Sequence, residues 1–123
     1  MSKTNIKRTN WLKKKVRTKK SLGDLGKYPR LIVFRSNKHI YGQLVDDNNN
    51  TTILSSSSKD KKLISAIKKN KNKIDQSKIV GSDLAEKIKK NKFDKIIYDR
   101  NGYRFHGRVK VIADTIKESG IKI

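Results

Sequence analysis

This sequence carries a large excess of positive charge. Its 123 residues include 32 Lys and Arg but only 11 Asp and Glu, which gives a formal net charge of +21 at pH 7. Apolar residues make up 33% of the sequence, enough for one small hydrophobic core. We therefore expect a single compact domain with a cationic surface and a polyanion as its partner.

The composition argues against several other classes of protein. The chain has no cysteine, so disulfides, thiolate nucleophiles and cysteine-ligated metal sites are excluded. The longest strongly apolar run covers residues 31–34, whereas a membrane span needs roughly 20 residues. The basic N-terminus is not followed by the apolar region of a secretory signal, and its Lys-rich, Ser-poor composition disfavours a transit peptide. We expect a cytoplasmic protein with no membrane partner, cofactor, metal or small-molecule substrate; an organellar location stays open.

Residues 1–29 are expected to form a basic, flexible arm. The first 20 residues contain nine cations, no acidic residue and too few apolar side chains for a core. Trp11, Leu12 and Val16 favour an amphipathic helix that becomes ordered when a polyanion neutralises the lysines. We interpret the arm as a polyanion-binding segment in preference to a solubilising tail. Its candidate contacts are Lys7, Arg8, Lys13, Lys14, Lys15, Arg17, Lys19 and Lys20.

Residues 30–123 are expected to form a compact α/β domain. The β-prone stretches 31–36 and 40–45 predict a hairpin, and residues 51–56 after a polar turn predict a third strand. These three strands should make an antiparallel meander. Residues 93–98 predict a fourth strand, which should pair parallel to the sheet because a helical crossover precedes it.

Apolar spacing predicts the helices of this domain. Stripes at 63–67 and 80–88 predict two helices, or one helix broken near Asp75. The spacing within 109–116, followed by Gly120, predicts a last helix with a glycine at its C-terminal end. The expected fold is therefore a mixed sheet packed with two or three helices, either all on one face or split unevenly.

Arginine marks two segments for contacts with phosphates and bases. Lys, Ile and Asn are all frequent, as a base-composition bias in the gene would make them, so the seven Arg are a better guide than the Lys. Five Arg lie within residues 30–41 and 99–108, and guanidinium groups suit phosphate recognition because of their bidentate geometry. The first segment contains the predicted hairpin tip. The second interleaves Arg with aromatic rings ahead of a helix N-terminus, a pattern typical of irregular RNA surfaces.

Each segment also has a purely structural alternative. The hairpin tip would then be an ordinary polar turn. The second segment would be a loop whose Tyr103 and Phe105 fill the core. We expect Phe105 to be partly structural and the three arginines of that segment not to be.

Two long strings resemble a known family. The string RLIVFRSNKHIYGQLVDD at 30–47 and the string DRNGYRFHGRVKVIADTIKESGIKI at 99–123 are similar to the signature regions of bacterial-type large-subunit ribosomal protein L18, and KIVGSDLAEKI around Gly81 resembles the family more weakly. The resemblance implies a non-catalytic structural protein of the ribosome. It would bind 5S rRNA and help attach it to 23S rRNA in the central protuberance, beside neighbouring large-subunit proteins. The arm is less similar to the family's usual Arg-rich leader, and Ile123 replaces an aromatic residue that the family often has.

The resemblance also implies rRNA contacts within the domain. These coincide with the segments chosen from charge and ring chemistry. Together with Arg30 of the first segment, the candidate residues are Arg35, Ser36, Asn37, Lys38, His39, Tyr41, Arg100, Tyr103, Arg104, His106, Gly107, Arg108 and Lys110.

Two other functions remain as alternatives. A nucleoid-type DNA-binding protein would have the same charge, although the sequence has no helix-turn-helix pattern. A metal-dependent nuclease would need Asp46, Asp47 and Asp99 to gather, with His106 as a proton shuttle. The structural alternative, which we prefer, is that Asp46 and Asp47 begin a turn and Asp99 neutralises Arg100.

Overall fold

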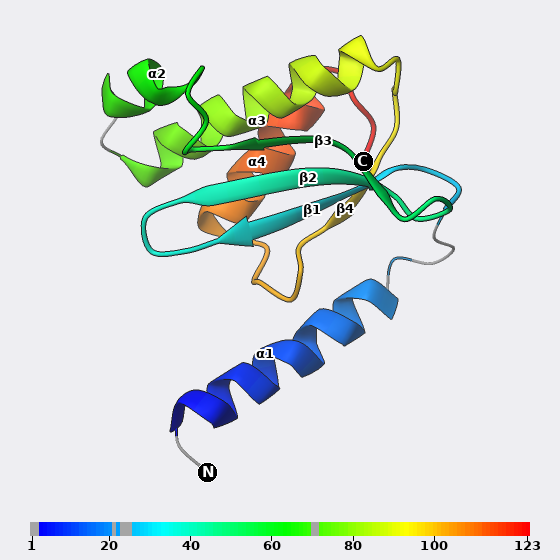
Figure 1. Cartoon of the computed structure of the whole chain (residues 1–123), viewed down its shortest axis with the longest axis vertical. Coiled ribbons are helices and arrows are strands. Elements are labelled where there is room, and N and C mark those ends of the chain that lie inside the picture. Colours follow the sequence, from blue (N-terminus) through cyan, green and yellow to red (C-terminus); the bar gives the residue numbers. More distant parts are fainter. Residues whose placement is uncertain (1–2, 21, 23–25, 70–71) are drawn as a thin grey trace.

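A four-stranded mixed sheet lies at the centre of the fold (Figure 1). The computed structural model describes residues 3–20, 22, 26–69 and 72–123, with side chains from Arg8 onward. The strand order is β3-β2-β1-β4, with β1 antiparallel to β2, β2 antiparallel to β3, and β1 parallel to β4. The predicted meander and the predicted parallel fourth strand are both confirmed. The strands are β1 (Arg30–Arg35), β2 (Ile40–Asp46), β3 (Thr51–Ser57) and β4 (Ile97–Asp99).

Within the described residues, four helices pack around the sheet. The region between β3 and β4 holds two of them, as the first of the two sequence alternatives predicts, and the break lies just ahead of Asp75. Asn72 caps the second of these, because its side chain accepts a hydrogen bond from the N–H of Ile74 at 2.8 Å. Gly120 ends the last helix with φ +96°, as predicted. The helices are α1 (Lys3–Lys20), α2 (Ile64–Lys69), α3 (Lys73–Lys90) and α4 (Gly107–Glu118).

The hydrophobic core lies between one face of the sheet and helices α3 and α4. Alternate strand residues point into it, and the i, i+4 stripes of both helices meet them. Burying each such side chain contributes about 1.5–3 kcal/mol. Gly42 lets α3 approach the sheet, since a Cβ at this position would lie 2.6 Å from a methyl carbon of Leu84. The fully buried members include Leu31, Val33, Leu44, Val80, Leu84, Ile88, Ile112 and Ile116.

Helix α1 lies on the opposite side of the sheet (Figure 1). Its residues Lys15 and Val16 line a hollow together with Ile32 and Phe34, and these strand residues alternate with the core residues of β1. The helices are therefore split unevenly between the two faces. None of the described helices has the length and apolar character needed to cross a membrane. The division into an arm over 1–29 and a domain over 30–123 stays a prediction.

Strand β4 is shorter than the predicted strand over 93–98. Phe93 packs partly buried against the core from the turn that follows α3. Lys95 forms an isolated parallel bridge with Lys122, so the chain pairs with the C-terminal segment before β4 reaches β1. Apolar residues in a sequence indicate burial, but not which kind of structure buries them. Here the sequence pattern predicts a strand, whereas the structure has a turn and an isolated bridge.

Arg30 has a structural role that the sequence does not predict. Its guanidinium group forms salt bridges with Asp47 at 3.0 Å and Asp99 at 3.1 Å, and its side chain is only 9% exposed. Arg30 is the first residue of β1 and lies on the face that α1 covers, and β4 places Asp99 beside it. The position of Arg30, and not its residue type, accounts for this structural role, and a phosphate contact by Arg30 stays a prediction.

The same contacts argue against the nuclease alternative. Asp47 and Asp99 do come together, but around a cationic side chain. Asp46 holds its turn as the structural interpretation predicts, by accepting hydrogen bonds from the N–H of Asn48 and the side-chain amide of Asn49. Asp99 pairs with Arg30, and not with Arg100 as predicted. Among the described residues, no group of three or more His, Cys, Asp or Glu is placed to hold a metal ion.

We predict that Arg30→Met lowers the free energy of unfolding by about 3–5 kcal/mol, because the buried carboxylate of Asp99 and the half-buried carboxylate of Asp47 lose their counter-charge. Urea denaturation followed by circular dichroism measures the change. Lys69→Met is the matched control: Lys69 is exposed, so its replacement should change stability by less than about 0.5 kcal/mol. Equal stabilities of the two variants would contradict a structural role for Arg30.

Candidate nucleic-acid interface

The loop between β4 and α4 folds back in a tight turn. Asn101 and Gly102 both have positive φ, of 56° and 80°, which glycine and asparagine adopt most readily. The N–H of Asn101 donates to the Asp99 carboxylate at 2.8 Å, and Arg100 donates to the carbonyl of Tyr103 at 2.9 Å. This turn directs Tyr103 and its neighbours toward α1.

Tyr103 joins three segments that are far apart in the sequence. Its ring stacks on Trp11 of α1 with centroids 5.9 Å apart and an interplanar angle of 30°. The guanidinium carbon of Arg35, at the end of β1, lies 4.9 Å from the centre of the same ring. Lys15 lies 5.2 Å from the centre of the Trp11 ring. Cation–π and ring stacking thus hold α1, the hairpin and the loop in one layered arrangement.

A cationic groove runs between α1 and this loop. It encloses about 340 Å³. A neighbouring hollow of about 360 Å³, which shares Lys14, Gly102 and Arg104 with it, extends past Trp11 to Arg35. No acidic side chain lines either space in the described part of the chain. The residues that line the cationic groove are Lys14, Arg17, Thr18, Arg100, Gly102 and Arg104.

Such a groove has the chemistry of a phosphate-binding surface. Guanidinium and ammonium groups converge on it from two elements, and they have no internal counter-charge there. Half-buried rings beside cations are also typical of surfaces on which unpaired bases stack. The arrangement has the groups for binding a polyanion and lacks the paired acid and base that hydrolysis requires.

The hairpin tip at residues 36–39 adds a second, shallower surface. It is a tight turn in which the N–H of Ser36 donates to the carbonyl of His39 at 2.8 Å, and Asn37 and Lys38 are exposed. The imidazole Nδ1 of His39 lies 3.0 Å from the hydroxyl of Ser58. Burial and the neighbouring charges of Lys59 and Lys38 lower the pKa of His39. The ring is therefore predominantly neutral at neutral pH.

Arg108 is a structural residue, contrary to our expectation for the three loop arginines. From the first turn of α4 it donates to the carbonyl of Ser36 at 2.9 Å and to that of His39 at 3.4 Å. The carbonyl of His39 also accepts from the N–H of Ser36, so Arg108 ties the start of α4 to both ends of the hairpin tip. Burial and the charge of Arg35 lower the pKa of Arg108. A phosphate contact through its remaining N–H groups stays a prediction.

Phe105 is partly structural, as expected. Its ring meets Tyr98 edge-on with centroids 6.2 Å apart, while the side chain remains 45% exposed. Tyr98 is itself held by a hydrogen bond to the carbonyl of Val109.

The other predicted contacts lie at the surface, except that the side chain of Lys7 is outside the described residues. The exposed and half-buried ones are Arg8, Lys13, Lys14, Lys15, Arg17, Lys19, Lys20, Arg35, Ser36, Asn37, Lys38, His39, Tyr41, Arg100, Tyr103, Arg104, His106, Gly107 and Lys110. Sequence reasoning missed Asn10, Trp11, Thr18 and Gly102, which line the two spaces beside α1. Trp11 could have been selected, because it is the only tryptophan and stands in a segment that has no core of its own.

Comparison with known proteins decides the family. Residues 5–123 match the family described as ribosomal L18 of archaea, bacteria, mitochondria and chloroplast. The chain belongs to the uL18 family. It is 45% identical over 121 residues to large ribosomal subunit protein uL18 of Chloroherpeton thalassium, covering 98% of both chains. The uL18 of Bdellovibrio bacteriovorus is 38% identical over 118 residues, which cover 96% of this chain and 92% of that one.

Membership of the uL18 family establishes a structural role in the large ribosomal subunit, with rRNA and other ribosomal proteins as the class of partner, and no enzymatic function. The match begins at residue 5, so it includes most of α1 as well as the sheet and the other helices. The cationic groove is therefore formed entirely by residues within the family match.

We predict that Arg108→Ala lowers the free energy of unfolding by about 1–3 kcal/mol, because two hydrogen bonds from a charged donor are lost. Arg104 is exposed, so Arg104→Ala should stay within about 0.5 kcal/mol of the parent protein. Urea denaturation of the two variants side by side measures the difference. Our assignment of Arg108 to the hairpin tip is wrong if both variants are as stable as the parent.

Proposed function

We propose that this protein binds 5S rRNA and helps attach it to 23S rRNA in the central protuberance of the large subunit, beside neighbouring large-subunit proteins. The observation that carries the proposal is the cationic groove with its adjoining ring stack, in a chain of the uL18 family. Lys and Arg hold phosphates, and the hairpin tip and loop fit the shape of a folded RNA. The corresponding location is the cytoplasm.

The form of the surface favours folded RNA over duplex DNA. Half-buried rings lie next to cations at two places, Tyr103 beside Arg35 and Tyr41 beside Lys59. Ring faces contribute binding free energy only where bases are unstacked, which is usual in RNA loops and bulges and rare in an intact duplex. A duplex would use the charge of the protein but not these rings.

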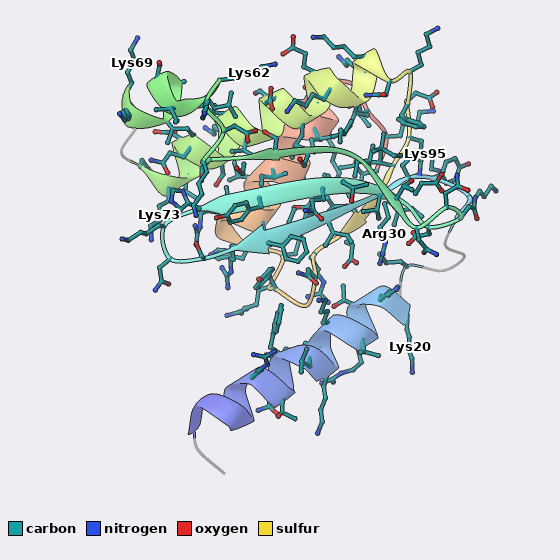
Figure 2. All side chains as sticks on the ribbon, in the orientation of Figure 1. Lys20, Arg30, Lys62, Lys69, Lys73 and Lys95 are labelled. Carbon is teal, nitrogen blue, oxygen red and sulfur yellow. The ribbon has the colours of Figure 1, made fainter. Side chains whose placement is uncertain are left out.

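We predict that the affinity for a 5S rRNA transcript falls steeply with salt, each neutralised phosphate adding about 0.7–0.9 to the slope of log K against log salt. Filter binding over a range of salt concentrations measures the slope. Arg104→Ala should lower this slope by the contribution of about one phosphate. Lys69→Ala removes the same charge from the far end of the molecule (Figure 2) and should leave it unchanged. A flat salt response would overturn the proposal.

The same assay separates the alternatives. Duplex DNA that competes as well as unlabelled 5S rRNA would favour the nucleoid-type function. Cleavage of the transcript after addition of Mg²⁺ would favour the nuclease.

We predict that bound RNA raises the pKa of His39, because a phosphate near the hairpin tip stabilises the imidazolium form. In the free protein this pKa is lowered, so binding takes up protons and the affinity should increase as the pH falls from about 8 to about 6. NMR titration of the imidazole C–H signals, with and without RNA, measures the shift. His39→Gln keeps a polar side chain and removes the titration, and it should weaken the pH dependence. An unchanged pKa in the complex would place the hairpin tip away from RNA.

A further inference from the structure

Helix α1 meets the rest of the molecule at a very close backbone contact. A Cβ added to Gly102 would lie 2.8 Å from the backbone N of Lys15 and 3.0 Å from its Cα. A backbone atom at that distance cannot move aside as a side chain can. Gly102 is therefore the position on which α1 rests, and the adjacent stack of Trp11 on Tyr103 fixes its orientation.

Docking at this place is opposed by charge. It brings Lys14 and Arg17 of α1 to the same groove as Arg100 and Arg104, and no acidic residue among the described ones lines that groove. Like charges that share a site repel each other, and the repulsion increases as water is excluded. Side-chain sticks from α1 and from the loop above it occupy the space between the two in Figure 2.

Docking also leaves polar groups without partners. The indole N–H of Trp11 and both polar atoms of the Asn101 amide are buried, with no hydrogen-bond partner among the described residues. Buried polar groups without partners oppose the state in which they are buried. The docked arrangement thus has a ring stack and one close contact in its favour, and clustered cations and unpaired polar groups against it.

We propose that the cationic groove is a phosphodiester-binding clamp, in which α1 docks on Gly102 and Tyr103 as an RNA phosphate enters between Lys14, Arg17, Arg100 and Arg104. This inference rests on the proposed function and specifies its site. A phosphodiester carries one negative charge, so it offsets part of the repulsion among the four converging cations, and neighbouring phosphates of the same strand offset more of it. A volume of about 340 Å³ is sufficient for a phosphate group and the atoms that flank it. By linkage, whatever weakens docking weakens phosphate binding by the same factor.

The chain contains its own reporter of docking. Trp11 is the only tryptophan, and in the docked state its ring lies against Tyr103. Quenching of its fluorescence by acrylamide, which is uncharged, therefore measures how far α1 is docked. The two probes are a 5S rRNA transcript and inorganic tripolyphosphate, which separate an RNA phosphodiester from free phosphate as the ligand.

Two glycines provide a matched pair of variants. Gly102→Ala places a methyl group against the α1 backbone. Gly120→Ala imposes a similar backbone strain, since φ is +80° at Gly102 and +96° at Gly120, but its methyl group meets nothing within 4 Å. The pair therefore separates the loss of α1 docking from the general effect of alanine at positive φ.

The expected results are specific. Addition of RNA should lower the acrylamide quenching constant of the parent protein and of Gly120→Ala by about two- to threefold, and that of Gly102→Ala hardly at all. Gly102→Ala should bind RNA about tenfold more weakly at 0.15 M salt, with a salt slope lower by about two phosphates, each counting about 0.7–0.9. If RNA does not bind the parent but tripolyphosphate still lowers its quenching constant, the clamp stands and its ligand is free phosphate.

Other results would overturn the clamp. It is wrong if RNA binds the parent without changing the quenching of Trp11, or if Gly102→Ala and Gly120→Ala bind RNA equally well; the proposed function would survive both results. Failure of the parent to bind 5S rRNA would instead remove the proposed function, and the tripolyphosphate titration would still test the groove. If Gly102→Ala does not fold by circular dichroism, Trp11→Leu replaces it, with RNA affinity and salt slope as readouts. Parent-like values would then reject the clamp.

Discussion

The scarcity of negative charge determines how this fold is organised. Only 11 acidic residues accompany 32 basic ones, and several of the acidic ones hold the fold together. Asp47 and Asp99 flank the buried Arg30, and Lys87 bridges the loop residue Asp60 and Asp83 of α3. Acidic groups used in this way are not available to neutralise the surface. The cationic groove is unbalanced for that reason, and an external polyanion is the partner that corrects the imbalance.

The sequence predicted those parts of the structure that depend on local patterns. Alternation and helical spacing report which residues face a core, so the meander, the crossover helices and α4 were predictable. The density of Arg and aromatic rings in the 99–108 segment was likewise visible without a structure. Strand β4 was placed too early, because burial of Phe93 in a turn produces the same apolar letters as burial in a strand.

The roles of individual arginines could not be predicted, because they depend on residues far away in the chain. Arg30 meets Asp99 across 69 positions, and Arg108 meets Ser36 across 72. The same residue type is structural at these two positions and faces the groove at Arg100 and Arg104. Residue chemistry is the same in both cases, and only the partner differs. Gly102 escaped prediction for the same reason, since its closeness to the α1 backbone is visible only once α1 is placed against the loop.

A groove of this kind is suited to a structural role in a ribonucleoprotein. An enzyme has to release its product, whereas a structural protein gains from a contact that becomes more stable as it forms. Four cations that repel one another in the free protein disfavour the docked state, and each phosphate that enters removes part of that repulsion. A single small anion would neutralise one charge, but successive phosphates of one strand neutralise several without a further loss of translational entropy. The arrangement therefore discriminates in favour of a polymer of phosphates, and it does so with no catalytic group.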